Sequence, residues 1–406
     1  MKRLSVATLV VAGLFSSQAF AVDTLADAFK NGTLKGELKA FYFDRDNGTS
    51  SADITTFGVL LGYKTASFYG LSMGTTFQGS SSPFVDSAGK TMFKNDEWGS
   101  GGVLSEAYIA YKMDKTEVKA GRMFFNTPLI ANSPARVIVQ SFEGATITNT
   151  NLPQTTLLAG VFSKFQDRTD GTGGMGTFEA LDNDHNKAYT LYAKNNSIKG
   201  LGLVGQFVTI SSDSSNLGIN LYYGEADYKS KLGSVGYNFA GQYLYADWDN
   251  FDSTDMIGFK IGGNFAGFSS YVAYSSISKN DNGKGVGRND KYAGFGNLTQ
   301  PIFTKAYGPY VGTYTHDTDA YAVDVNYDFK NLNLLTGARY SVTQRDSIAS
   351  GTGVNTRSSY DVSYTDFYAK YRFSGALKGM CLDVCYLDVG KDGVGSELWV
   401  KAIYKF

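Results

Sequence analysis

The final ten residues of the chain alternate between two kinds of position. One set of alternate positions is apolar throughout and consists of Leu398, Val400, Ala402, Tyr404 and Phe406. The positions between them carry Glu397, Trp399, Lys401, Ile403 and Lys405. A period of two residues indicates a β-strand, because successive side chains of a strand point to opposite faces. The chain is therefore predicted to end in a strand with one apolar face.

Similar alternation recurs along the whole chain, for example in residues 33–43, 256–263 and 362–373. We predict eighteen strands, and a count of sixteen is the alternative. They lie near 33–43, 53–64, 69–79, 103–112, 115–124, 138–148, 154–165, 186–194, 201–210, 216–228, 234–246, 253–265, 268–279, 319–329, 333–342, 362–373, 377–388 and 395–406. The class predicted from this pattern is all-β and antiparallel.

The connections between these strands alternate between short and long. Short connections lie around 65–68, 113–115, 149–153, 195–200, 229–233, 266–267, 330–332 and 374–376. The longer ones include 80–102, 125–137, 166–185, 280–318 and 343–361. Outer-membrane barrels alternate short periplasmic turns with long outer loops, whereas a soluble sandwich has no reason to do so.

The composition agrees with a sheet that is apolar on one face only. The chain has 47 glycines and only 6 prolines, 15% aromatic residues and 18% charged residues, with a mean hydropathy of -0.20. Soluble domains are usually nearer a quarter charged. After residue 21, no apolar run approaches the roughly 18 residues that a transmembrane helix needs.

The first 21 residues read as a secretory signal peptide. Lys2 and Arg3 precede an apolar stretch, and Ala19-Phe20-Ala21 forms an A-x-A cleavage site. Removing 1–21 changes the formal charge from -1 to -3 because two basic residues are lost. We expect one domain, 22–406, in the outer membrane of a Gram-negative bacterium, with the terminal aromatic Phe406 serving as the signal for the barrel-assembly machinery.

The membrane then selects the architecture. Every backbone polar group needs a partner in lipid, so a spanning sheet must close into a transmembrane β-barrel. Eighteen strands leave a lumen wide enough for water, which predicts passive diffusion of small polar solutes. A plugged structural or adhesive barrel is the alternative, and the loops 80–102 and 280–318 are large enough to fill a lumen.

Strand parity assigns the charged residues that face this lumen. The basic ones are Lys35, Lys39, Lys112, Lys260, Arg339, Lys370, Arg372 and Lys401. The acidic ones are Glu37, Glu106, Glu143, Asp366 and Glu397. The basic excess favours a weak preference for anions, because rings of like charge set ion selectivity. Equally, opposite charges could cancel across the lumen.

Three segments resemble the OprD-type porin family of Gram-negative outer membranes. The first is GRMFFNTPLIANSPARVIVQSFEGATITNTNLP (121–153), in which Q-S-F-x-G opens a strand after a proline-containing loop. The second, 296–341, runs from GNLTQPIFTKAYGPY to a strand with G-A-R-Y, and the third is DFYAKYRFSGALKGMCLDV (366–384). Together with the strand count, the resemblance covers most of the chain after residue 21.

The resemblance implies an eighteen-stranded barrel that is a monomer or a loose homotrimer. It also implies an inward-folded constriction loop, about 125–137, with Arg122 and Arg136 at its edges. A ladder of basic side chains, into which Arg339 and Arg372 fit, would pass carboxylate-bearing solutes such as amino acids, organic acids and small peptides. The expected membrane partners are outer-membrane lipid and lipopolysaccharide.

Two residues depart from the ladder that the resemblance implies. Glu143 stands where a basic residue would suit it, and Arg122 shares parity with Val118 and Ala120. A β-bulge would re-aim Arg122. Both departures leave the identity of the solute open.

Catalysis, metal binding and nucleic-acid binding find little support. The only histidines, His185 and His316, both lie in predicted loops, and the oxygen-rich loop 182–186 is better explained by solvated acids than by Ca²⁺. Basic residues alternate along strands and do not cluster, which disfavours nucleic acid. Cys381 and Cys385 would be roughly 13 Å apart in a strand, too far for a disulfide. We expect no enzyme activity and no cofactor.

Overall fold

A computed structural model describes residues 22–181, 187–210, 218–249, 252–279, 301–308, 314, 316–345 and 359–406. The predicted signal peptide 1–21, the loop 182–186 with His185, and much of the predicted loop 280–318 lie outside the described residues. All statements below concern the described residues.

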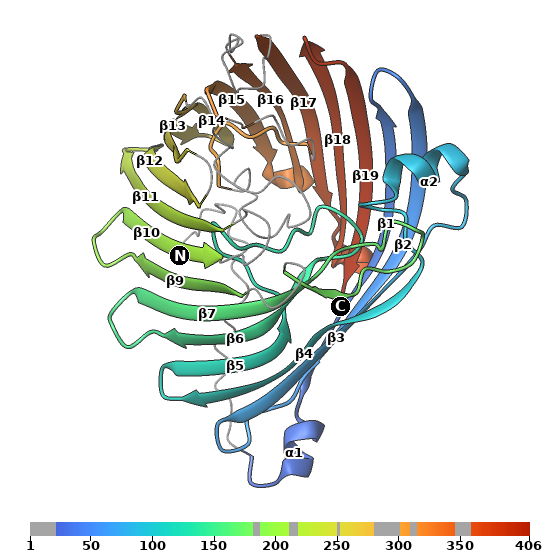
Figure 1. The fold of residues 1–406 in the computed structure, drawn as a ribbon, viewed down its shortest axis with the longest axis vertical. Helices are drawn as coiled ribbons and strands as arrows, with labels where there is room; N and C mark the ends of the chain where they lie inside the picture. The colour runs from blue at the N-terminus through green and yellow to red at the C-terminus, as the bar shows by residue number, and fades with distance from the viewer. Residues whose placement is uncertain are drawn as a thin grey trace.

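The described chain forms one antiparallel sheet that closes into a barrel (Figure 1). The strands are β1 Thr33–Asp46, β2 Ser51–Lys64, β3 Leu71–Ser81, β4 Gly101–Met113, β5 Thr116–Met123, β6 Ser141–Asn149, β7 Thr155–Gln166, β8 Phe178–Ala180, β9 Ala188–Asn195, β10 Leu201–Ile210, β11 Ile219–Leu232, β12 Val235–Trp248, β13 Thr254–Phe265, β14 Phe268–Ile277, β15 Thr318–Phe329, β16 Leu334–Arg345, β17 Tyr360–Arg372, β18 Met380–Lys391 and β19 Gly395–Lys405. Eighteen of them make the wall, and β8 is a three-residue strand beside the end of β7.

Helical structure is minor. The described helices are α1 Leu25–Lys30, which precedes the barrel, and α2 Ser87–Phe93, which lies in the connection between β3 and β4. Two 3₁₀ turns, η1 Lys330–Leu332 and η2 Gly375–Leu377, lie in short connections. Among the residues described, no helix has the length and apolarity needed to cross a bilayer.

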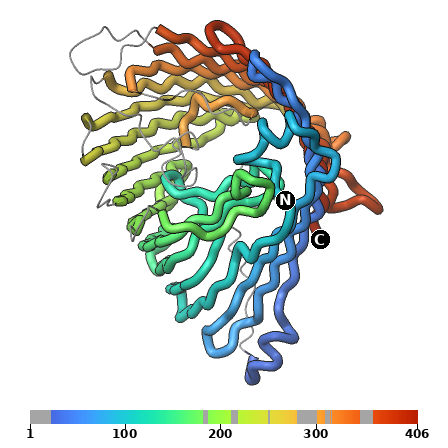
Figure 2. The backbone as a smooth tube through the Cα atoms, turned by 45° about the vertical axis from the view of Figure 1, so that its right-hand side comes forward, coloured from blue at the N-terminus to red at the C-terminus, as the bar shows by residue number. Residues whose placement is uncertain are grey.

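The predicted all-β barrel with eighteen wall strands is confirmed. Each of the eighteen predicted segments overlaps one observed wall strand, and β8 is the only strand of the described chain that the alternation did not predict. Because the strand number of the wall is even, β1 begins and β19 ends at the same end of the barrel. We call this end, which holds the short connections, the turn end, and the opposite one the loop end (Figure 2).

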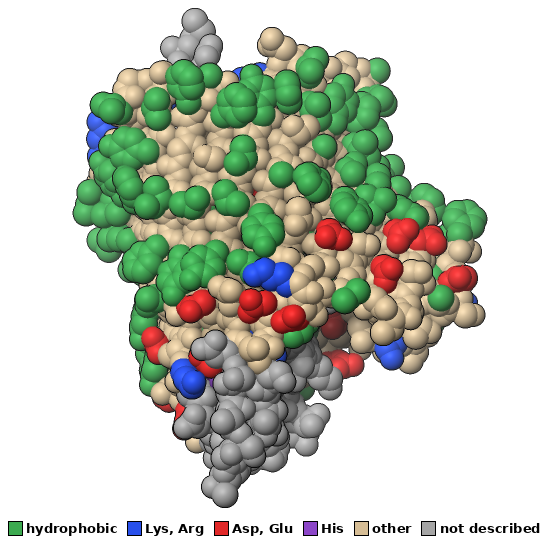
Figure 3. Space-filling view, turned by 90° about the horizontal axis from the view of Figure 1, so that it is seen from above, with side chains coloured by type: hydrophobic (Ala, Val, Ile, Leu, Met, Phe, Trp, Pro, Cys, Tyr) green, Lys and Arg blue, Asp and Glu red, His purple; other side chains and the backbone are tan. Residues whose placement is uncertain are grey.

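The two faces of each strand differ as the alternation predicts. On β13, Ile257, Phe259 and Ile261 are exposed on the outer face, whereas Lys260 points inward over the ring of Phe303. Hydrophobic side chains are spread over the outer wall in Figure 3, and charged side chains gather toward one end. An apolar exterior facing lipid with a polar interior is the arrangement of outer-membrane barrels.

Pairing of the first and last strands closes the wall. β1 pairs with β19 from Glu37↔Lys405 to Asp46↔Ser396. Beyond this ladder, the Gly36 N–H donates to the Phe406 carbonyl at 3.0 Å, and the Phe406 N–H donates back at 3.1 Å. Gly36 has no side chain, which leaves room for the Phe406 ring.

Two glycines face each other where β5 pairs with β6. Gly121 pairs with Gly144, and Gly121 has a φ of 126°, which side-chain-bearing residues rarely adopt. A Cβ atom at Gly121 would collide with the carbonyl oxygen of Ala107. Two residues further on, the chain leaves the wall after Met123 and enters the barrel.

Both cysteines are free, as predicted from their spacing. Cys381 and Cys385 lie on β18 with side chains on its inner face, and Cys385 is buried against Asp366. The strand geometry keeps the two sulfur atoms apart.

We expect Gly121→Ala to destabilise the folded barrel by about 1–3 kcal/mol, because the methyl group meets backbone that cannot move aside. Urea unfolding in detergent micelles, followed by the gel shift of the folded barrel, measures this. Gly224→Ala is the matched control, because a Cβ at Gly224 meets nothing within 4 Å. Equal unfolding midpoints for the two variants would contradict the prediction.

Candidate functional site

The residues predicted to line the pore occupy three places in the structure. On the inner face of the wall lie Lys39 of β1, Lys260 of β13, Arg339 of β16, and Lys370 and Arg372 of β17. Arg136 is buried within the barrel, on the segment 124–140 that joins β5 to β6. Arg122 and Glu143 lie on the outer face of the wall.

Strand parity in the structure places Arg122 and Glu143 on the outer face, away from the lumen that they were predicted to line. Arg122 lies four residues beyond the exposed Val118 on β5, and Glu143 four residues before the exposed Ile147 on β6. The register between β5 and β6 continues unbroken through Arg122↔Glu143, so no bulge turns Arg122 inward. The irregularity lies instead between β6 and β7, next to Glu143.

The segment 124–140 crosses the lumen from one side of the wall to the other. On one side, the Lys39 ammonium group donates to the Val137 carbonyl at 2.9 Å. On the other, the Gln206 side chain of β10 accepts from the Leu129 N–H at 2.9 Å and donates to the Thr127 hydroxyl at 2.7 Å. β1 and β10 lie roughly half-way round the wall from each other. The segment therefore divides the interior.

A charge cluster fixes the second half of this segment. Arg136 lies 3.0 Å from the Asp96 carboxylate and 3.7 Å from that of Glu397. Arg45 of β1 pairs with the same two carboxylates, at 3.1 and 2.8 Å. Asp96 follows α2, so the cluster joins two loops to β1 and β19. The Arg136 guanidinium also stacks over Phe43, with its carbon 4.5 Å from the ring centre.

The two acids after α2 respond oppositely to this environment. Burial opposes ionisation of Asp96, but Arg136 and Arg45 together hold its pKa below the usual value. Burial raises the pKa of the neighbouring Glu97 to about 7, against the opposing effect of Arg136. Glu97 accepts one hydrogen bond, from the Val137 N–H at 3.3 Å. Its charge therefore changes in the physiological range.

A second internal segment, 301–308, lies along the wall from β12 to β17. The Gln242 side chain accepts from the Phe303 N–H at 3.0 Å. The Asp366 carboxylate accepts from the N–H groups of Tyr307 and Gly308 at 3.0 and 2.7 Å.

Stacking and a cation reinforce this attachment. The ring of Tyr307 stacks on that of Tyr368 with centres 3.8 Å apart. The Arg339 guanidinium donates to the Lys305 carbonyl at 3.1 Å. Burial also lowers the pKa of the Lys305 ammonium group to about 8. Segment 301–308 is thus fixed to the wall at several points along its length.

Some of the inward bases are paired with acids. Arg339 pairs with Asp324 at 2.9 Å, Lys370 with Asp383 at 3.5 Å, and Lys39 with Glu37 at 3.4 Å. The charges of these three bases are thus balanced by three neighbouring acids. Within the described ranges, no carboxylate oxygen lies within 4.0 Å of the ammonium groups of Lys260, Lys305 or Lys401. Lys260 and Lys401 instead lie over aromatic rings.

Apolar side chains fill part of the interior. One cluster extends from Met123 and Leu129 through β10–β14 to Ile302 and Ala320. It places the tip of segment 124–140 against an apolar wall. In the part of the chain that the structure describes, no group of His, Cys, Asp or Glu side chains is arranged to hold a metal ion.

Several residues of this interior were not predicted. Asp324 lies two positions from the buried Ala322 on β15, so the parity of the predicted strand 319–329 contains the signal for it. Arg45 continues the inward parity of Lys39 beyond the predicted end of its strand. Asp96, Gln206 and Lys305 become part of the site through contacts between distant segments, for which the alternation carries no signal.

The sequence and the fold were compared with those of known proteins. The family described as outer membrane porin, OprD family, matches residues 55–263, just over half of the 406-residue chain. No curated protein sequence matches the chain.

Solved structures share the fold at low identity. OccAB2 of Acinetobacter baumannii is 18% identical with a TM-score of 0.76, covering 94% of this chain and 99% of that one. OccK8 (OprE) of Pseudomonas aeruginosa is 13% identical with a TM-score of 0.75, covering 93% and 99%. OpdK of Pseudomonas aeruginosa, solved with vanillate, is 13% identical with a TM-score of 0.70, covering 93% and 99%.

Gln206→Leu should free the tip of segment 124–140, because two hydrogen bonds to Thr127 and Leu129 are lost. At about 1 kcal/mol per bond, the population of displaced tips rises roughly ten-fold or more. Recordings in a planar bilayer should show more frequent current fluctuations than wild type. Gln344→Leu, an exposed position on β16, is the control. Fluctuations unchanged by Gln206→Leu would mean that these bonds do not hold the tip.

Proposed function

This chain belongs to the OprD family of outer-membrane porins, and we propose that it is a passive, non-catalytic channel for small polar solutes that carry a carboxylate group. Amino acids, organic acids and small peptides are the solute classes that we expect. The observation that carries the proposal is the lumen-crossing segment 124–140, fixed at Lys39, Gln206 and Arg136. We propose that 125–137 forms the constriction of the channel.

The charges beside the crossing favour anionic groups. Lys260, Lys305 and Lys401 face the interior without a carboxylate within ion-pair distance in the described chain. A cation whose partner is not already in place is free to attract the carboxylate of a passing solute. The vanillate in the OpdK structure is an aromatic carboxylate, which supports this solute class by analogy. Because other bases are paired, we expect the preference for anions to be weak.

A plugged structural or adhesive barrel is the second candidate. The apolar cluster around Leu129, Ile130 and Phe142 favours it, because such a cluster in a lumen excludes water. Conductance separates the two candidates, since a plugged barrel passes no current.

We further propose how the protein reaches and occupies its membrane. Residues 1–21 would direct export and be removed. The C-terminal Phe406, exposed at the turn end, would be recognised by the barrel-assembly machinery. The mature barrel would contact outer-membrane lipid and lipopolysaccharide, as a monomer or a loose homotrimer. No nucleic acid is involved.

The refolded protein should give stable open steps in a planar bilayer. Under a salt gradient, the reversal potential should favour anions weakly. Lys260→Glu and Arg372→Glu should each move it toward cations, because each replaces an inward positive charge by a negative one. Lys30→Glu, on α1 outside the wall, is the control. Cation preference in wild type would overturn the charge assignment, and absence of any conductance would overturn the channel.

The anion preference should weaken as pH rises from about 6 to 9. Glu97, with a pKa raised to about 7, gains a negative charge over this interval. Lys305, with a pKa lowered to about 8, loses a positive one, so both changes have the same sign. Reversal potentials at several pH values measure this. The double variant Glu97→Gln/Lys305→Met should flatten the dependence, and a profile as steep as wild type would assign the titration to other groups.

A further inference from the structure

Three charged side chains lie together on the outer face of the wall. Glu143 accepts from Arg122 at 3.2 Å and lies 3.0 Å from the Lys164 ammonium group. The side chains of Arg122 and Lys164 are 36% and 44% exposed. The guanidinium carbon of Arg122 lies 4.2 Å from the ring centre of Phe178. This outer-wall cluster carries two positive charges and one negative charge.

The inner face at the same height belongs to different residues. Phe142 and Phe165, which alternate with Glu143 and Lys164, are buried inside the barrel against Phe125 and Phe162. The outer-wall cluster therefore cannot reach the lumen. A lysine or arginine facing hydrocarbon at the bilayer centre costs about 2–4 kcal/mol, and the cost falls to about 0–1 kcal/mol near the interface.

The height of the cluster places it toward the outer leaflet. Arg122 is the next-to-last residue of β5, and Lys164 is two residues from the end of β7. Both strand ends lead into the loop end of the barrel. The cluster thus lies on the side where the long loops emerge, which is the outer side in barrels of this type.

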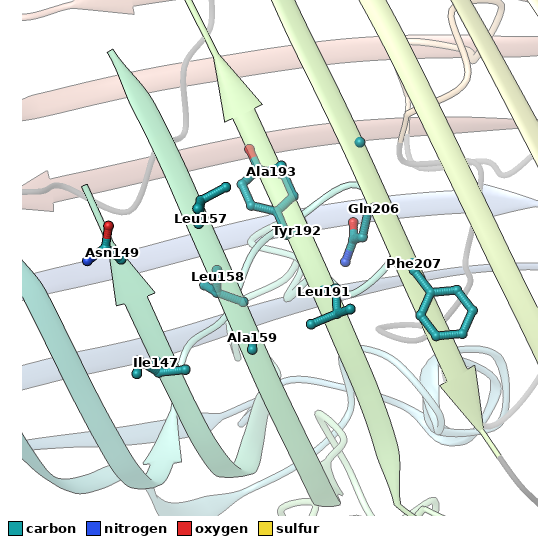
Figure 4. A pocket seen from close by; sticks show the side chains of 11 residues that line it. Ile147, Asn149, Leu157, Leu158, Ala159, Leu191, Tyr192, Ala193, Gln206 and Phe207 are labelled. Atoms are coloured by element: carbon teal, nitrogen blue, oxygen red, sulfur yellow. The ribbon is translucent and has the colours of Figure 1, made fainter. Parts of the chain in front are cut away.

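An apolar groove lies below the cluster on the same side of the barrel. It has a volume of about 450 Å³ and is formed by β6, β7, β9 and β10 (Figure 4). Leu191 and Phe207 stand beside small residues, Ala159, Ala193 and Gly205. At Gly205, a Cβ atom would find only one atom, at 4.0 Å, so packing within the chain does not require a glycine there.

Resting on the outer-membrane location and lipopolysaccharide contact proposed above, we propose that this outer-wall face binds one lipopolysaccharide molecule, with a lipid A phosphate on Arg122 and Lys164 and an acyl chain in the groove. Glu143 takes one guanidinium N–H and part of the ammonium group, so further donors remain for phosphate oxygens. From Lys164 to Ala159 along β7 is roughly 15 Å. That is about half of the roughly 30 Å hydrocarbon thickness, the depth that one acyl chain reaches.

Charge complementarity selects this occupant over the alternatives. A second copy of the chain would bring the same positive excess against itself if the two faces met symmetrically. Phospholipids fill the inner leaflet, whereas the cluster lies at the loop end. Lipid A carries phosphates next to several acyl chains, which matches a cationic rim above an apolar groove.

Lipid-free protein, refolded in detergent, is titrated with diphosphoryl lipid A and analysed by native mass spectrometry. Wild type should carry one lipid A. Arg122→Gln/Lys164→Gln should weaken binding by about ten-fold or more, as expected for the loss of charge-assisted hydrogen bonds. Gly205→Leu should weaken it as well, by filling the groove. Lys115→Gln/Lys199→Gln, which removes two exposed lysines from turn-end connections, should bind as wild type.

Three results would overturn the proposal. The first is equal lipid A binding by wild type and Arg122→Gln/Lys164→Gln. The second is equal binding of lipid A stripped of its phosphates, or of phosphatidylglycerol. The third is a dimer in place of the lipid adduct. Conductance of the same variants is a separate readout, and it should stay at the wild-type value because the cluster lies outside the lumen.

Discussion

In the apolar interior of a bilayer, a backbone N–H or C=O group without a partner costs several kcal/mol, and a sheet with two free edges has a row of them on each. The pairing of β1 with β19 removes those edges. It requires an even number of wall strands, the return of the chain to the end where it began, and space at Gly36 for the terminal Phe406. Closure turns one face of the sheet toward lipid and the other toward a lumen. The alternation of apolar and polar side chains therefore separates an outer face from an inner face.

The segments that leave the wall face the same requirement without a ladder. Segment 124–140 gives up strand pairing, and its backbone groups are bonded by side chains of the wall, including Gln78, Lys39 and Gln206. Segment 301–308 is bonded in the same manner by Gln242 and Asp366. Long polar side chains on the inner face thus supply hydrogen bonds to backbone groups that a neighbouring strand would supply within the wall. This explains why glutamines and an aspartate are buried inside the barrel.

The wall could be predicted from the sequence because strand parity is a local property. Each of the eighteen alternating segments predicts a strand without information from the rest of the chain. The same alternation predicts that Lys39, Lys260 and Arg339 point inward. Strand parity alone places Arg122 on the outer face, whereas the basic ladder implied by the family resemblance placed it in the lumen. The structure agrees with strand parity. The pairing of Arg136 with Asp96 was out of reach, because it joins two loops that are 40 residues apart and whose paths depend on the closed wall around them.

Fastening one segment to nearly opposite walls has a mechanical consequence. A thin cylinder resists stretching along its strands, but it is soft toward flattening into an ellipse, and the lateral pressure of a bilayer acts on it from all sides. Segment 124–140 is hydrogen-bonded to Lys39 through Val137 on one side and to Gln206 through Leu129 on the other. It therefore links two nearly opposite sides of the wall. The two attached sides of the wall are then held apart by a segment only seventeen residues long, and the barrel becomes harder to flatten along this diameter.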